Sequence, residues 1–217
     1  MDMSAKIIIL AGHDLDDPDW TRSQIGTDDL IICADSGLRH AIAFGVIPAH
    51  VIGDFDSVDP AHLDWAKAQQ GVAVHHEADQ NATDLQKALS LSLEHSKDAQ
   101  IIVFGALGGR LDHQFGNILS LERFDGHSRI ALRDKTTHLR LLSQPFSFEG
   151  QIGDYVGVIP LRETKNLRYE GLEYAAEDLG PPYNLGWLGT SNVMSADEGR
   201  VDFDSGIVLF IHTSAPD

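Results

Sequence analysis

The first half of this chain alternates short apolar runs with segments of helical character, and this alternation restricts the fold more than any other feature. Apolar, largely β-branched runs occur at residues 7–11, 30–34, 51–52, 72–74 and 101–104. Asp59-Pro60 between two of these runs is a helix start, and Gly45 is a helix stop. Short buried strands that alternate with helices are typical of a mostly parallel sheet. The sequence therefore predicts an α/β domain over residues 1–126.

The pattern changes after about residue 126. Ile130 and Leu132 alternate with Ala131 and Arg133, and short strand-like stretches continue as far as Ile211. Few helical stripes appear in this half. Alternating short strands without helices are typical of two packed antiparallel sheets. We therefore expect a second, all-β domain, a sandwich, over residues 127–217.

The composition narrows the function classes. The chain has 217 residues with 42% hydrophobic residues, enough for a packed core. A net charge of -17 argues against a nucleic-acid partner, because phosphate neutralisation needs Lys and Arg. The apolar run at residues 7–11 is too short for a signal-peptide core or a membrane span, and Cys33 is the single cysteine. We expect a soluble, cytoplasmic protein that contacts neither nucleic acid nor membrane.

Carboxylates gather at the carboxyl ends of the predicted strands. In Val51–Ser57, Asp54 and Asp56 follow a buried strand at i and i+2, which would put both on one face of an extended chain. Asp35, Asp79 and Asp84 also fall at or just beyond strand ends, where ligands bind in such sheets. Close carboxylates repel unless a cation lies between them, and oxygen ligands favour Mg²⁺. The sequence predicts a Mg²⁺ site here, and the alternative is an Asp-rich turn with a solvated acidic rim.

The glycine-rich segment Gly105–His113 follows the fifth predicted strand. Gly108 and Gly109 would let backbone N–H groups approach a phosphate, and Arg110 offers bidentate contacts to it. The segment matches neither the Walker pattern nor the dinucleotide GxGxxG pattern. Asp112 and His113 have the alternative role of holding the start of the helix predicted over residues 111–124.

A polar segment in the predicted β domain offers a second ligand contact. Thr190, Ser191 and Asn192 follow two glycines, and Trp187 could stack on a flat or cationic ring. The alternative is a hairpin loop with a core tryptophan, which the spacing alone favours.

Together, these motifs resemble the thiamin pyrophosphokinase family. The resemblance runs in family order through Cys33–Gly37, Gly53–Ser57, Asp79–Asp84, Gly105–His113 and Gly189–Asn192. It implies an α/β domain, a C-terminal β-sandwich and a homodimer with sites at the subunit interface. It also implies transfer of a diphosphoryl group from ATP to the hydroxyl of thiamin, which gives thiamin diphosphate and AMP.

The resemblance also assigns site residues. Asp35, Asp54, Asp56 and Asp84 match the family's acids that hold Mg²⁺ and the phosphates, with Asp54, Asp56 and Asp84 as metal ligands and catalytic groups. Gln80 and Thr83 match its polar neighbours, Arg110 and Asp112 its glycine-loop residues near ATP, and Ser191 and Asn192 its loop that meets thiamin. Many members carry Ser where this chain has Trp187.

Two alternatives remain open from the residues. One is a Mg²⁺-dependent nucleotide hydrolase, with water in place of thiamin. The other is a non-catalytic protein that binds a small ligand. Either Asp56 or Asp84 could accept the proton of the thiamin alcohol.

Overall fold

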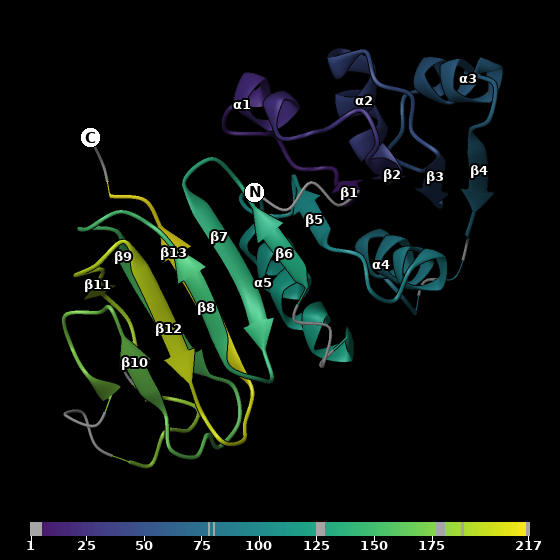
Figure 1. The fold of residues 1–217 in the computed structure, drawn as a ribbon. Helices are drawn as coiled ribbons and strands as arrows, with labels where there is room; N and C mark the ends of the chain where they lie inside the picture. The colour runs from purple at the N-terminus through teal and green to yellow at the C-terminus, as the bar shows by residue number, and fades with distance from the viewer. Residues whose placement is uncertain are drawn as a thin grey trace. The chain divides into compact units, whose positions relative to one another are not determined.

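The computed structural model describes residues 6–77, 79, 81–124, 129–176, 181–187 and 189–215, and every structural statement below concerns these residues. The chain divides into two compact units, shown in Figure 1. The first contains residues up to 120 together with 132–135, and the second contains 121–131 and 136–217. The expected boundary between residues 126 and 127 stays a prediction.

The first unit is built on a parallel sheet. Its strands are β1 (Ile7–Leu10), β2 (Leu30–Ala34), β3 (His50–Gly53), β4 (Ala73–His76) and β5 (Ile101–Phe104), in the order β5-β1-β2-β3-β4. Each neighbouring pair is parallel. Because the strands are parallel, their carboxyl ends lie along one edge of the sheet, as the sequence predicts.

Helices cover this sheet on both faces (Figure 1). The helical elements of the first unit are α1 (Pro18–Ser23), the 3-10 helix η1 (Asp35–Gly37), α2 (Leu38–Phe44), α3 (Pro60–Ala68), α4 (Asp84–His95) and α5 (Leu111–Ser120). The 3-10 helix η2 (Leu121–Phe124) follows α5 and is assigned to the second unit. One core cluster joins Leu38 of α2 and Ala66 of α3 to Val51 of β3. Helix α4 packs on β1, β2 and β3 and buries Leu85, Ala88 and Leu89. The predicted α/β class is confirmed.

The second unit is antiparallel. Its strands are β7 (Thr137–Leu142), β8 (Phe146–Glu149), β9 (Tyr155–Pro160), β10 (Arg168–Glu170), β11 (Asn192–Val193), β12 (Glu198–Asp202) and β13 (Val208–Thr213), and β6 (Ile130–Arg133) falls where the two units divide. Strands β11, β9, β13 and β7 are neighbours in one sheet, and β10, β12 and β8 form another. Phe148 of β8 packs on Phe210 of β13 with ring centroids 4.7 Å apart, so side chains of both sheets share one core. The predicted sandwich is confirmed.

The structure differs from the sequence predictions at three places. The acidic stretch His13–Trp20 is expected from its sequence to be a solvated loop, but helix α1 starts inside it, because Asp17 caps the helix by accepting from Trp20 N. The predicted third strand ends at Gly53, and the chain turns at Phe55, which has a φ of 63°. The helix predicted over residues 111–124 becomes 3-10 after Ser120.

Among the described residues, no helix is both long and apolar enough to cross a membrane.

Candidate active site

A pocket of about 590 Å³ lined by several acidic residues opens in the first unit at the carboxyl ends of the strands. Its walls come from the segments that follow β1, β2, β3 and β5, from the start of α4 and from α5. The lining residues that carry acidic or basic side chains are His13, Asp35, Asp54, Asp56, Asp84, Asp112 and His113. Five carboxylates in one pocket repel one another, so an anionic ligand needs a bound cation to enter it.

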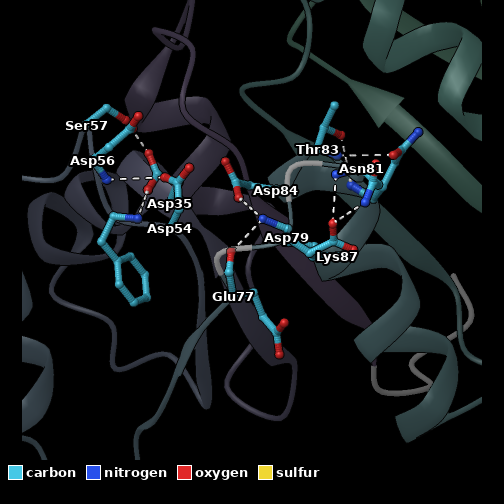
Figure 2. Close-up of polar contacts among 12 residues, drawn as sticks. Asp35, Asp54, Asp56, Ser57, Glu77, Asp79, Asn81, Thr83, Asp84 and Lys87 are labelled. Carbon is cyan, nitrogen blue, oxygen red and sulfur yellow. Dashed lines mark hydrogen bonds and ion pairs between the residues drawn. The ribbon is translucent and has the colours of Figure 1, made fainter.

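Asp35 organises the acidic side of this pocket. It is 7% exposed and has a φ of 47°, a left-handed conformation that is strained for a residue with a side chain. Its Oδ1 accepts a hydrogen bond from Phe55 N at 3.1 Å, and its Oδ2 accepts from the Ser57 hydroxyl. Through both contacts, Asp35 holds the turn that carries Asp54 and Asp56 (Figure 2).

Asp54 and Asp56 lie in this turn and not on a strand face. Asp56 N donates to Asp54 Oδ1 at 3.2 Å, which is a turn of the kind that aspartate favours. The local reason is Phe55, whose positive φ reverses the chain directly after Gly53. The pKa of Asp56 is raised, first by the negative charge of Asp54 and then by burial and Asp35.

Asp84 approaches from the start of α4. Thr83 caps this helix: its hydroxyl accepts from Gln86 N at 3.2 Å, and the Gln86 side chain accepts from Thr83 N at 3.1 Å. Asp84 is therefore the first helical residue, where the helix dipole favours a negative charge. Burial raises the pKa of Asp84, while the ammonium of Lys87, 3.1 Å away, opposes this shift.

The carboxylates of Asp35, Asp54 and Asp84 converge closely enough to hold a metal ion. Each offers one oxygen, and the three oxygens lie within 4.8 Å of one another; among the described residues no other such group is found. Such a set of carboxylate oxygens fits a hard cation such as Mg²⁺. Sequence reasoning brings Asp54, Asp56 and Asp84 together as ligands, whereas the geometry groups Asp35 with Asp54 and Asp84 and leaves Asp56 exposed at the rim.

The opposite wall of the pocket is formed by glycine turns and histidines. Gly105 has a φ of 70°, and a Cβ there would lie 2.5 Å from Ala11 O, so only glycine fits. His13 and His113 face each other with ring centroids 6.1 Å apart. Burial and then His113 lower the pKa of His13, which favours the neutral form of its ring.

Several predicted nucleotide contacts lie beside this pocket and do not line it. Gly108 and Gly109 adopt positive φ values of 87° and 68° and are exposed. Arg110 forms a bidentate pair with Asp112, at 3.1 and 2.6 Å, and its side chain is 72% exposed. Gln80 lies outside the described residues.

A smaller pocket of about 200 Å³ opens in the second unit, where Thr190, Ser191 and Asn192 lie. The side-chain amide of Asn192 forms two hydrogen bonds with the backbone of Tyr174. Its Oδ1 accepts from Tyr174 N at 3.0 Å, and its Nδ2 donates to Tyr174 O at 2.7 Å. Ser191 is exposed, with a φ of 62°.

Two aromatic residues near this smaller pocket have different positions. Tyr169 lines it, and its buried hydroxyl has no hydrogen-bond partner in the part of the chain that the structure describes. Trp187 is half-buried and packs edge-on against Tyr183, with centroids 5.2 Å apart, and it joins the sandwich core. Its ring does not line the pocket.

Sequence reasoning missed Lys87, His13, Asn117 and Tyr169 as site residues. Lys87 shares a helix face with Asp84 at i+3, a spacing that could have indicated it. Asn117 lies on α5 and donates to Ala106 O at 2.9 Å. No local sequence signal identifies Tyr169, because its place depends on the pairing of β10 with β12.

Comparison with known proteins identifies the family of the chain. A family model described as "Thiamin pyrophosphokinase, catalytic domain" matches residues 21–132, and one described as "Thiamin pyrophosphokinase, vitamin B1 binding domain" matches residues 146–208. Thiamine pyrophosphokinase 1 of Oryza sativa subsp. japonica is 30% identical over 218 residues, which cover 88% of this chain and 80% of that protein. Thiamine pyrophosphokinase of Bacillus subtilis (strain 168) is 31% identical over 192 residues, 85% of this chain and 87% of that protein.

A solved structure shows the same fold over almost the whole chain. The crystal structure of thiamine pyrophosphokinase from Bacillus subtilis superposes with a TM-score of 0.82 at 27% sequence identity, and it covers 97% of this chain and 100% of that one. The catalytic-domain model alone spans more than half of the present sequence. The chain therefore belongs to the thiamin pyrophosphokinase family of enzymes.

Proposed function

We propose that this chain transfers the diphosphoryl group of ATP to the hydroxyl of thiamin and releases AMP. The observation that carries the proposal is the convergence of Asp35, Asp54 and Asp84 in the pocket of a chain from this family. In this proposal the α/β domain, residues 1–126, binds Mg²⁺ and ATP, and the β-sandwich, residues 127–217, binds thiamin.

Asp35, Asp54 and Asp84 would hold Mg²⁺. When bound, the ion would neutralise the carboxylates and the phosphates and would position the diphosphoryl group. The protein's own contribution is then orientation and charge placement, as in other phosphoryl transfers. The hydrogen bonds from Phe55 N and from the Ser57 hydroxyl keep Asp35 oriented, and Lys87 keeps Asp84 oriented.

Asp56 is our candidate for the proton acceptor. In the transfer, the thiamin hydroxyl oxygen forms a bond to the β-phosphorus of ATP. The bond between the β-phosphorus and the oxygen that bridges it to the α-phosphorus breaks, and AMP leaves with that oxygen. The hydroxyl proton goes to a carboxylate. Asp56 lines the pocket, its raised pKa favours proton uptake, and no cation is paired with it among the described residues, whereas Asp84 is paired with Lys87.

Thiamin would bind in the smaller pocket of the second unit. Thr190 and Ser191 offer hydroxyls there, and the unpartnered hydroxyl of Tyr169 is a further polar contact. Asn192 would shape this pocket through its hold on Tyr174. The core packing of Trp187 supports a role behind the pocket wall and not as a stacking surface.

An activity assay with three controls, each of which omits one component of the reaction, tests the proposal. The purified protein is mixed with ATP, Mg²⁺ and thiamin, and AMP and thiamin diphosphate are followed by chromatography. We expect equal amounts of both products, formed only when all three components are present. AMP formed at the same rate without thiamin would instead identify a Mg²⁺-dependent nucleotide hydrolase.

Substitution of Asp54 tests the metal assignment. Asp54→Asn removes one charged ligand, and we expect turnover to fall by about 10²–10³-fold while the fold is retained. Asp64→Asn is the matched control, because Asp64 is an exposed residue of α3 and does not line the pocket. Near-normal turnover of Asp54→Asn would contradict the assignment.

A further inference from the structure

Three histidines of the first unit lie close together outside the carboxylate pocket. His50 is the first residue of β3, His75 belongs to β4, and His95 is the last residue of α4. His50 Nδ1 lies 3.1 Å from His75 Nε2, and the two ring centroids are 5.2 Å apart. The His95 ring centroid is 6.4 Å from that of His50, so His50 lies within reach of both partners.

Strand register explains why these rings meet. In the parallel ladder, His50 is opposite Ala73, and Ile52 is opposite His75. Residues two apart on a strand share a face, so His50 and His75 project from the same side of the sheet. Val51 and Val74, which alternate with them, belong to the core cluster with α2 and α3. The histidines therefore lie on the opposite face, where α4 packs.

This cluster is separate from the carboxylate pocket. Asp54 comes four residues after His50, about 13 Å along an extended strand. His95 ends a helix that starts at Asp84, about 16 Å away along the helix axis. None of the three histidines lines the carboxylate pocket. His50 thus lies at the amino end of β3 and His95 at the end of α4 away from Asp84, whereas His75 lies one residue before the carboxyl end of β4 and outside the lining of the carboxylate pocket.

The chemistry of the cluster differs from that of the acids. Two nitrogens bound to one tetrahedral Zn²⁺ at 2.0–2.1 Å are separated by about 3.4 Å, close to the spacing of His50 Nδ1 and His75 Nε2. Within the described part of the chain, neither ring is hydrogen-bonded or ion-paired to a carboxylate. Imidazole nitrogens without carboxylates suit Zn²⁺, Ni²⁺ or Cu²⁺ and not Mg²⁺.

We propose that His50, His75 and His95 form a binding site for a divalent transition-metal ion of the Zn²⁺ class. His50 and His75 supply a preformed pair of nitrogens. His95 is exposed, and the nitrogens of the three rings do not all lie within 4.8 Å of one another, so the His95 side chain would turn toward His50 on binding to become the third ligand, with water as the fourth. Such an ion would tie the edge strand β4 to β3 and to the end of α4, so its effect is on stability and not on the diphosphoryl transfer.

Metal titration of the full chain tests this site. All titrations use the Asp54→Asn background after treatment with a chelator, so that the carboxylate pocket contributes little. Zn²⁺ affinity is measured by competition with a chromophoric chelator, Co²⁺ binding by visible absorption, and the midpoint of thermal unfolding is recorded with and without Zn²⁺. Mg²⁺ is the negative control, because a site made of nitrogens alone binds it poorly.

We expect one equivalent of Zn²⁺ to bind and to raise the unfolding midpoint by several degrees at 100 times its Kd. His50→Gln and His95→Gln should each weaken Zn²⁺ binding at least tenfold, and His62→Gln on α3, the matched control, should not. Because His95 is exposed, His95→Gln remains informative even where His50→Gln unfolds. The absence of Zn²⁺ binding, or equal affinity in His95→Gln and His62→Gln, would overturn the proposal and leave the pair as a hydrogen bond between two imidazoles.

Discussion

Among single residues, Lys87 has the clearest energetic consequence. Its ammonium donates to Asp84 Oδ1 at 3.1 Å and to Glu77 O at 2.8 Å, and its side chain is 9% exposed. Lys87→Met keeps the apolar stem but leaves Asp84 without its cation. We expect the free energy of unfolding to fall by about 1–3 kcal/mol. Urea unfolding without ligands measures this change.

A double-mutant cycle separates the ion pair from simple packing loss. Lys87→Met combined with Asp84→Asn removes both members of the ion pair. The decrease in unfolding free energy of the double variant should therefore be clearly smaller than the sum of the decreases in the two single variants. Strictly additive losses would mean that the two side chains do not stabilise each other. Activity is not needed for this comparison, so it stands apart from the proposed reaction.

Asp154 makes a second prediction at this scale, and it concerns pH. Burial raises the pKa of Asp154, but hydrogen bonds from Gln151 N, Ala215 N and His212 outweigh that effect, and the pKa is lowered. A lowered folded pKa stabilises the protein above the unfolded pKa of about 3.9, and this stabilisation is lost as the pH falls through the folded value.

The matched variant is Asp154→Asn. At pH 7 the free energy of unfolding of this variant should be about 1–3 kcal/mol lower than that of the parent protein, because the backbone donors lose a charged acceptor. Below about pH 4 the difference should begin to shrink, since Asp154 of the unfolded parent chain then takes up a proton, and it should shrink further as the pH falls through the lower pKa of the folded state. Chemical unfolding at pH 7 and at pH 3.5 measures the difference in unfolding free energy between the two proteins at each pH. A gap of the same size at the lower pH would mean that the charge of Asp154 is not what stabilises the fold.

At the scale of elements, the start of α4 combines a helix cap with a pocket wall. Thr83 caps α4 and lines the carboxylate pocket, whereas Asp59 caps α3 by accepting from Ala61 N at 2.9 Å and does not line it. Thr83→Ala and Asp59→Ala should therefore each cost about 1 kcal/mol of stability. Only Thr83→Ala should also raise the KM for ATP. Equal KM values in the two variants would remove Thr83 from the nucleotide site.

Elements with a local signal could be predicted from the sequence. The β-branched runs predict β2 and β5, and Asp59-Pro60 predicts α3, because burial and capping act over a few residues. The same Asp-Pro pair occurs at Asp17-Pro18, where α1 begins. The acidic residues around it favour a loop, so this helix is not expected from the sequence.

The candidate site was predictable to the extent that strand ends determine it. Asp35, Asp54 and Asp84 converge because parallel strands end at one edge. The turn at Phe55, which separates Asp56 from them, has no sequence signal, because a positive φ at phenylalanine is imposed by contacts such as the bond from Phe55 N to Asp35. The same limit applies to the histidine cluster, whose members are joined by register and helix length alone.

At the scale of the whole molecule, helix α5 presents an apolar stripe that the described chain leaves uncovered. Leu111, Phe115 and Leu119 are spaced at i, i+4 and i+8 and are 67%, 56% and 52% exposed. Residues at this spacing lie on one helix face. Asp112, His113 and Asn117 of the same helix line the carboxylate pocket. A partner that covered the stripe would thus approach the site.

This stripe supports the expected homodimer and gives it a test. Phe115→Glu places a charge in the centre of the stripe, and we expect it to shift the protein from dimer to monomer in light scattering after size exclusion. Ile47→Glu is the matched control, because Ile47 is also 56% exposed but belongs to the connection between α2 and β3 and not to α5. If active sites form across the interface, Phe115→Glu should lose activity with little change in unfolding midpoint, and activity of the parent protein should fall on dilution below the dimer Kd. A fully active monomer would separate the site from the interface, because each chain would then hold a complete site by itself.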